Sequence, residues 1–138
     1  MPVAFQWTAS LATGVPDVDD QHKEIFRRAN VLFEACVRGK SAEEVRPLLE
    51  YLQSYIREHF TAEEAQHDAA RYPGRVSHRV LHRTMAAHLA ELTLVLEEAG
   101  AGANLVRLTN RLVVGWLVNH IMREDRAFAE YLRSRPTP

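Results

Sequence analysis

Five histidines and two carboxylates recur along this chain of 138 residues at spacings suited to a pair of metal ions. All five histidines fall on the apolar faces of expected helices. A buried imidazole or carboxylate needs a compensating partner, and several buried together need strong compensation. A bound metal pair would supply that compensation, so the pattern predicts a dinuclear metal site. The set consists of His22, His59, Glu63, His78, His82, His120 and Asp125.

Two pairs within this set have the spacing of neighbours on one helix face. His59 and Glu63 are four residues apart, and so are His78 and His82. On a helix, residues at this spacing differ in direction by only about 40°. Each pair is therefore expected to reach a common site in the core.

The spacing of His120 and Asp125 fits a regular helix less well. Five residues correspond to about 140° on an ideal helix, which leaves Asp125 at the flank of the inner face. Helical geometry alone favours Glu124 as the inward carboxylate. A local widening of the helix, which is common at functional sites, would bring Asp125 inward instead.

Donor counting favours a redox metal pair with one open position. Two irons that each prefer six ligands need roughly twelve bonds in all. Five imidazoles, two bridging carboxylates and one bridging oxygen supply about eleven. The remaining position would be free for a small molecule such as dioxygen.

Helices must position these residues. Apolar residues recur with helical period in four segments, and sustained period-two alternation is absent. Ser41 and Glu44 form a capping-box pattern, whereas Pro47 lies past the first turn, so the second helix either bends at Pro47 or begins there. Asn104 is the expected cap of the last helix. The expected helices cover about 19–37, 41 or 47 to 72, 76–99, and 104 to near 136.

Four helices joined by short loops pack most simply as an all-α, up-down-up-down antiparallel four-helix bundle. We expect residues 19–138 to form this single-domain bundle and residues 1–18 to form an N-terminal arm. Phe5 and Trp7 are expected to lay the arm against the bundle. In this topology the histidines of all four helices fall at the same end.

Composition restricts the partners and the compartment. Apolar residues make up 46% of the chain and charged residues 25%, as in ordinary globular proteins. The net charge of −1 offers no field that would attract nucleic acid or an anionic membrane. No stretch approaches the ~18 apolar residues of a membrane helix, and no secretory signal is visible. The single cysteine, Cys36, fits a reducing compartment, so we expect a cytoplasmic monomer.

Several segments resemble the hemerythrin family, and its bacterial single-domain branch above all. The resemblance covers nearly the whole chain and implies two iron ions (Fe2+/Fe3+) joined by a bridging oxo or hydroxo group. It favours Asp125 over Glu124. The segments are DVDDQH (17–22), HFTAEE (59–64), YPG (72–74), HRVLH (78–82) and HIMRED (120–125).

The resemblance also implies a role for each ligand. One iron would be held by three histidines and the other by two, and dioxygen would bind the iron that has two. The implied ligands are His78, His82 and His120 on one iron, His22 and His59 on the other, and Glu63 and Asp125 as bridges.

The function implied by the family is reversible dioxygen binding, for storage, delivery or transport to a cytoplasmic oxygen-consuming client, rather than catalysis. The pocket around the open position should be dry and apolar, because water and protons would promote irreversible oxidation of the iron. Four residues that flank the ligands match positions lining this pocket in the family. They are Phe60, Trp116, Leu117 and Ile121.

Other functions remain open on the sequence alone. An oxygen or redox sensor could act through a separate partner, and a di-iron enzyme could oxidise substrates or scavenge peroxide or nitric oxide. Ferritin-like oxidases need the Glu-x-x-His motif twice, and this chain has it once, at Glu64 and His67. Zinc suits the same donors, but a structural zinc site uses four ligands. His67 and His88 match no ligand position and are expected at the surface or its boundary.

Overall fold

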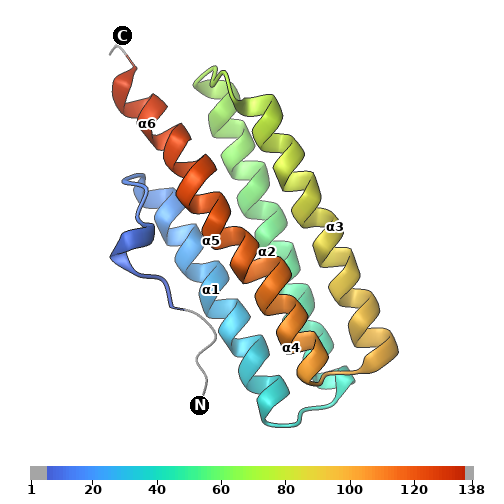
Figure 1. The fold of residues 1–138 in the computed structure, drawn as a ribbon. Helices are drawn as coiled ribbons and strands as arrows, with labels where there is room; N and C mark the ends of the chain where they lie inside the picture. The colour runs from blue at the N-terminus through green and yellow to red at the C-terminus, as the bar shows by residue number, and fades with distance from the viewer. Residues whose placement is uncertain (1–5, 136–138) are drawn as a thin grey trace.

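The computed structural model describes residues 6–135, which form an antiparallel bundle of four helical rods (Figure 1). This confirms the all-α bundle expected from the sequence, and residues 6–135 contain no strand. A short 3-10 turn, η1 (Ala9–Leu11), precedes the bundle. The first three rods are α1 (Pro16–Val37), α2 (Ala42–Ala69) and α3 (Arg75–Ala99). The fourth consists of α4 (Ala103–Thr109), η2 (Asn110–Gly115), α5 (Trp116–His120), η3 (Ile121–Asp125) and α6 (Arg126–Ser134).

The segment before α1 is tied to the bundle by a buried carboxylate. Asp19 Oδ1 accepts hydrogen bonds from the backbone N–H and the hydroxyl of Thr13, both at 2.8 Å. Pro16 stands at the start of α1, where its missing N–H is not needed. The helix therefore begins three residues earlier than the periodicity predicts. Trp7 packs against the core, and Phe5 lies outside the described residues.

The capping box at the start of α2 is present. The Glu44 backbone N–H donates to Ser41 Oγ at 3.2 Å, and the Ser41 backbone N–H donates to the Glu44 carboxylate at 3.1 Å. The helix begins at Ala42 and includes Pro47 in its interior, so Pro47 does not start it. Two N–H groups that lack helical partners are satisfied by this reciprocal pair.

Replacing Ser41 by alanine is expected to lower the free energy of unfolding by about 1 kcal/mol, because the Glu44 N–H loses its acceptor. Urea denaturation of the metal-free protein measures the change. Ser54→Ala is the matched control, because Ser54 is exposed within the same helix and caps nothing. Equal effects of the two substitutions would contradict the capping role.

The prediction that Asn104 caps the last helix is wrong. Gly100 has a φ of 83° and ends α3, and Gly102 is the residue that precedes α4. These two glycines let the chain reverse within three residues, so the helix is already under way at Ala103. Asn104 consequently lies inside the first turn.

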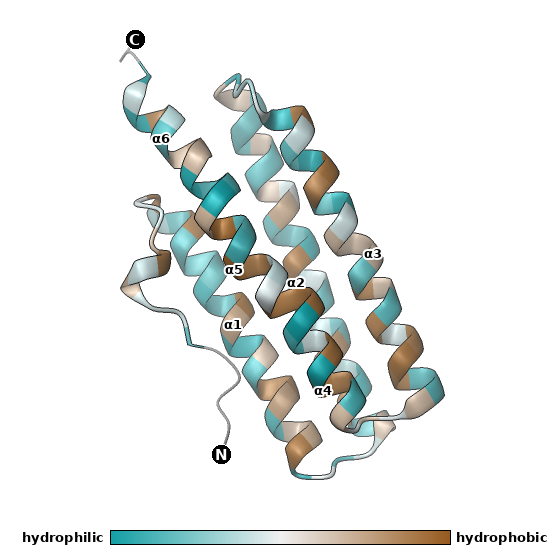
Figure 2. Cartoon of the chain, viewed as in Figure 1, coloured by the Kyte–Doolittle hydropathy of each residue, from teal (hydrophilic) through white to brown (hydrophobic). Residues whose placement is uncertain are grey.

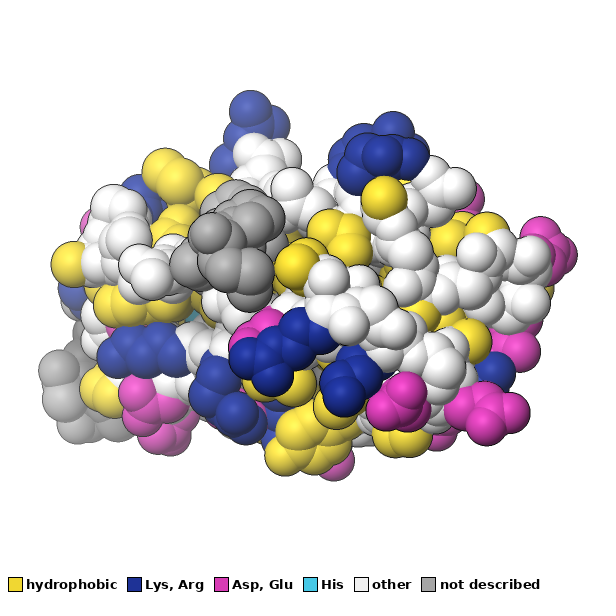
Figure 3. Space-filling view, turned by 90° about the horizontal axis from the view of Figure 1, so that it is seen from below, with side chains coloured by type: hydrophobic (Ala, Val, Ile, Leu, Met, Phe, Trp, Pro, Cys, Tyr) yellow, Lys and Arg dark blue, Asp and Glu magenta, His cyan; other side chains and the backbone are white. Residues whose placement is uncertain are grey.

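The apolar core fills the half of the bundle nearer the α1–α2 loop. Each rod contributes an apolar stripe, visible as brown bands alternating with teal along the ribbons (Figure 2). At that end of the molecule, basic, acidic and apolar side chains are all exposed and histidine is hardly visible (Figure 3). No described helix is long and apolar enough to cross a membrane. The fully buried core includes Ile25, Leu32, Leu49, Leu52, Ile56, Met85, Leu89, Leu92, Leu96 and Leu105.

Candidate metal centre

The structure brings all seven residues singled out in the sequence into one buried cluster. The cluster lies towards the end of the bundle at which α1 and α3 begin and α2 ends (Figure 1). Each side chain is almost completely withdrawn from solvent, with 0–4% of its residue surface exposed. They come from every rod: His22 from α1, His59 and Glu63 from α2, His78 and His82 from α3, His120 from α5 and Asp125 from η3.

The cluster divides into two sets of possible ligand atoms, each set lying within 4.8 Å of one another. Three imidazoles belong to the first set and two to the second. Glu63 belongs to both. The first set is Glu63, His78, His82 and His120, and the second is His22, His59, Glu63 and Asp125.

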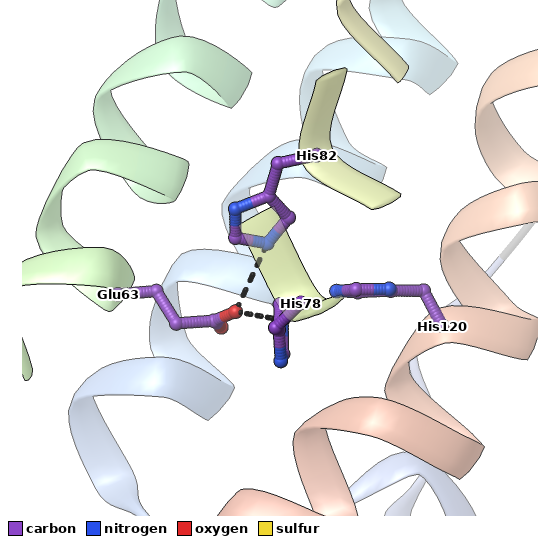
Figure 4. Close-up of side chains that lie close together, drawn as sticks. All are labelled: Glu63, His78, His82 and His120. Atoms are coloured by element: carbon purple, nitrogen blue, oxygen red, sulfur yellow. Dashed lines mark hydrogen bonds and ion pairs between the residues drawn. The ribbon is translucent and has the colours of Figure 1, made fainter. Parts of the chain in front are cut away.

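The two oxygens of Glu63 face different sets. Oε1 lies 2.6 Å from His78 Nε2 and 3.2 Å from His82 Nε2 (Figure 4). Oε2 lies 3.5 Å from His59 Nε2. The carboxylate thus stands between the three-histidine set and the two-histidine set.

Asp125 repeats this arrangement from the opposite rod. Its Oδ1 lies 3.2 Å from His78 Nε2 and 3.4 Å from His120 Nε2. Its Oδ2 lies 3.1 Å from His22 Nε2. Two carboxylates that each offer one oxygen to either set are placed as bridges between two positions.

A π-helical turn brings Asp125 inward. η3 (Ile121–Asp125) adds a residue to the turn that follows His120, so five residues there span about one full turn. Asp125 is therefore buried, while Glu124 is only half-buried. The preference of ideal helical geometry for Glu124 is wrong for this reason.

The second π-helical segment, η2 (Asn110–Gly115), shifts the inner face of the same rod. Leu117 is buried with 2% of its surface exposed, whereas Trp116, expected to line the same dry pocket, is half-buried. Trp116 nevertheless stacks on the His120 ring at 4.4 Å with 14° between the planes. It therefore borders the cluster from the outside.

Many polar atoms of the cluster have no hydrogen-bond partner. A buried polar atom without a partner is costly, and so many at one place are unusual. All of them are atoms that ligate metals, so the donor set fits a pair of divalent or trivalent ions. The atoms are both ring nitrogens of His22 and of His78, Nε2 of His59 and of His120, Oε2 of Glu63, and both carboxylate oxygens of Asp125.

The protonation states in the metal-free cluster differ from one imidazole to the next. Burial lowers the pKa of His59 to about 4, so its ring is neutral at pH 7. Burial also disfavours the charged form of His78, but the nearby carboxylates of Asp125 and Glu63 outweigh it and raise its pKa to about 9. Burial and the Asp125 charge oppose ionisation of Glu63, yet its histidine partners lower its pKa to about 2. At pH 7 these values leave Glu63 ionised, His59 neutral and His78 protonated.

His67 is buried, contrary to the expectation that it lies at the surface or its boundary. None of its surface is exposed, and both of its ring nitrogens lack a hydrogen-bond partner. Its ring packs edge-on against His78 at 4.4 Å, and its Nε2 lies 4.0 Å from Glu63 Oε1. Its position four residues after Glu63 on the inner face of α2 could have indicated this. His88 is half-buried, as expected.

Two residues outside the predicted set hold ligand imidazoles from behind. His82 Nδ1 donates to Glu64 Oε2 at 2.8 Å, and His59 Nδ1 donates to Gln21 Oε1 at 2.5 Å. Because each Nδ1 donates away from the cluster, Nε2 is the ring nitrogen that faces the cluster and would bind a metal there. Neither Gln21 nor Glu64 was predicted from the sequence, although each directly adjoins a predicted ligand.

The four residues expected to line a dry pocket do not all share one environment. Phe60, Leu117 and Ile121 are buried in the core, and Phe60 stacks on His82 at 3.8 Å. Trp116 instead borders a surface notch of about 140 Å³ that reaches the His120 ring and also includes polar side chains. The apolar residues therefore cover the cluster on its core side.

Comparisons with known proteins agree with this geometry. The family described as "Hemerythrin HHE cation binding domain" matches residues 13–132. A bacteriohemerythrin of Methylococcus capsulatus is 32% identical over 127 residues, covering 91% of this chain and 95% of that protein. Myohemerythrin-1 of Phascolopsis gouldii is 28% identical over 125 residues, covering 91% and 92%. A crystal structure of wild-type hemerythrin superposes with a TM-score of 0.81 at 31% identity, covering 94% of this chain and 98% of the other.

Proposed function

The chain belongs to the hemerythrin family, and from this membership and the geometry of the cluster we propose that it is a non-haem di-iron protein that binds dioxygen reversibly. The proposed role is storage, delivery or transport of oxygen rather than catalysis. Its site would hold two iron ions (Fe2+/Fe3+) with a bridging oxo or hydroxo group. Its single buried cysteine supports a place in the reducing cytoplasm, where the proposed protein is a monomer that serves an oxygen-consuming client.

One observation carries the proposal: both buried carboxylates direct one oxygen to each histidine set. Such an arrangement suits two ions a short distance apart and is not needed for a single four-ligand ion. The proposed ligands of one iron are His78, His82 and His120, those of the other are His22 and His59, and the proposed bridges are Glu63 and Asp125.

The iron pair, when bound, would supply the electrons for reversible reduction of dioxygen. The chain contributes the surroundings. The lone pair at Nε2 of His59 and of His82 is kept available because Nδ1 of each ring donates elsewhere. Phe60, Leu117 and Ile121 exclude water on the core side, which limits the protons that could reach the site.

The experiment that tests the proposal is purification in air followed by iron analysis and absorption spectroscopy. We expect about two irons per chain, from the ligand count, and a visible absorption band that fades under vacuum and returns with air. Two irons with irreversible oxidation and turnover of a reductant would indicate an enzyme instead. A protein without iron would refute the proposal.

Leu117→Ala is expected to speed the irreversible loss of the air-induced absorption band by about tenfold, because the truncated side chain admits water to the core side of the site. The decay is followed spectroscopically at constant temperature. Leu105→Ala is the control, since Leu105 is equally buried but lies in α4, at the far end of the bundle. If both variants decay at the same rate, general loosening of the fold and not water access is responsible.

A further inference from the structure

The two imidazoles held from behind differ in the charge of the group that holds them. His82 Nδ1 faces the Glu64 carboxylate at 2.8 Å, and His59 Nδ1 faces the Gln21 amide oxygen at 2.5 Å. In Figure 4, one ring nitrogen of His82 points to Glu63 and the other points away from the cluster. His82 belongs to the three-histidine set and His59 to the two-histidine set.

The Glu64 carboxylate is held in position from the protein surface. Its side chain is 28% exposed, and its Oε1 lies 3.4 Å from Arg79 Nε. Arg79 is itself fixed by Asp68, at 2.5 Å between Nη2 and Oδ2. The chain Asp68–Arg79–Glu64–His82 thus extends from the surface of α2 and α3 to the cluster.

This charged contact distinguishes His82 from other imidazoles of the cluster. Within residues 6–135, Nδ1 of His22 and Nδ1 of His78 have no hydrogen-bond partner. The partner of His59 Nδ1 is a neutral amide. An ionised acceptor makes a hydrogen bond roughly twice as strong as a neutral one. The hydrogen bond at His82 Nδ1 is therefore expected to polarise its ring more than the one at His59 Nδ1 does.

An imidazole that donates its second N–H to a carboxylate is a more basic ligand, and a more basic ligand favours the more highly charged state of the metal. We propose that Glu64 and Gln21 are positioning residues that widen the difference between the two iron positions beyond the difference in the number of histidines. Glu64 favours the ferric state at the three-histidine position, and Gln21 leaves the two-histidine position closer to ferrous. This inference rests on the proposed function, because it presupposes an iron pair.

A charge exchange between the two positions tests it. Electrochemical titration through both one-electron oxidations is carried out on four iron-loaded proteins: the wild type, Glu64→Gln, Gln21→Glu and the double exchange. The iron at the three-histidine position is expected to be oxidised first, and its couple is called the first couple. At a fixed potential, Glu64→Gln is expected to lower the ferric-to-ferrous ratio of this couple by about tenfold. This corresponds to a rise of about 59 mV in its reduction potential. Gln21→Glu is expected to raise that ratio for the second couple by a similar factor, and the double exchange should show both shifts.

The outcomes separate the two claims. Wild-type protein without an iron pair refutes the proposed function and this inference with it. A second outcome is that the wild type holds an iron pair and binds oxygen reversibly, while the two reduction potentials stay unchanged, or shift equally, in the variants. That result refutes the inference and leaves the proposed function standing. Helix content by circular dichroism verifies folding, and if Glu64→Gln does not fold, Gln21→Glu still decides the question. Arg79→Gln, which keeps the carboxylate but removes its clamp, should shift the first couple less than Glu64→Gln.

Discussion

Asp125→Asn is expected to purify with less than half of the wild-type iron content. Asp125 offers one oxygen to each histidine set, and an amide replaces one of these oxygens with a nitrogen that cannot bridge. Loss of residues that only support ligands already costs about 10–100-fold in metal affinity, so loss of a bridge should exceed about 100-fold. Iron per chain after purification, together with Co2+ titration of the metal-free protein, measures the change.

The neighbouring residue provides the control. Glu124→Gln removes the same charge one position earlier, from a half-buried side chain that borders the surface notch beside His120 and belongs to neither set of possible ligand atoms. We expect it to keep the wild-type iron content. If Glu124→Gln lost the metal and Asp125→Asn kept it, the metal site would use Glu124, and the π-helical turn that brings Asp125 inward would be contradicted.

Periodicity in the sequence predicted the bundle and most of the cluster. Apolar stripes with a period of about 3.6 residues define the buried face of a helix, and His59 and Glu63 lie on that face at i and i+4. Antiparallel packing then places residues from the start of one helix beside those from the end of the next. Side chains on the inner stripe of a regular helix could therefore be placed without coordinates.

Residues that depend on a local departure from regularity could not be placed by geometry. Whether Asp125 or Glu124 faces inward depends on one extra residue in a turn, which periodicity does not show; the family resemblance favoured Asp125. Gln21 and Glu64 act through single hydrogen bonds between neighbouring helices, and the direction of a side chain at the edge of a helix face is set by packing. His67 matches no ligand position in the family, so the ligand pattern gives no reason to expect its burial, although it lies on the inner face of α2.

The metal-free protein is expected to lose stability steeply as the pH falls from 6.5 to 4. Burial lowers the pKa of both His59 and His67 to about 4, against about 6.5 in an unfolded chain. In this interval the unfolded chain binds protons that the native protein does not, so protonation favours unfolding. The loss should be on the order of 3 kcal/mol for each imidazole by pH 4. Denaturant titrations at a series of pH values measure it.

His78 acts in the opposite direction at alkaline pH. Its pKa of about 9 means that the native protein keeps a proton that the unfolded chain releases near pH 6.5. Its stabilising contribution is complete below pH 6.5 and disappears as the pH rises through 9. The stability of the metal-free protein should therefore pass through a maximum near pH 6.5.

His67→Met separates the acid-side contributions. Methionine has no titrating group, so the variant should lose less stability between pH 6.5 and 4 than the wild type, by on the order of 3 kcal/mol. At pH 8 neither His67 nor methionine exchanges a proton on unfolding, and the variant should then be more stable by about 1–3 kcal/mol, because two unpartnered ring nitrogens are removed. If the variant lost as much stability between pH 6.5 and 4 as the wild type, the native protein would already accommodate a proton on His67. The complete burial of His67 without a hydrogen-bond partner argues against that result.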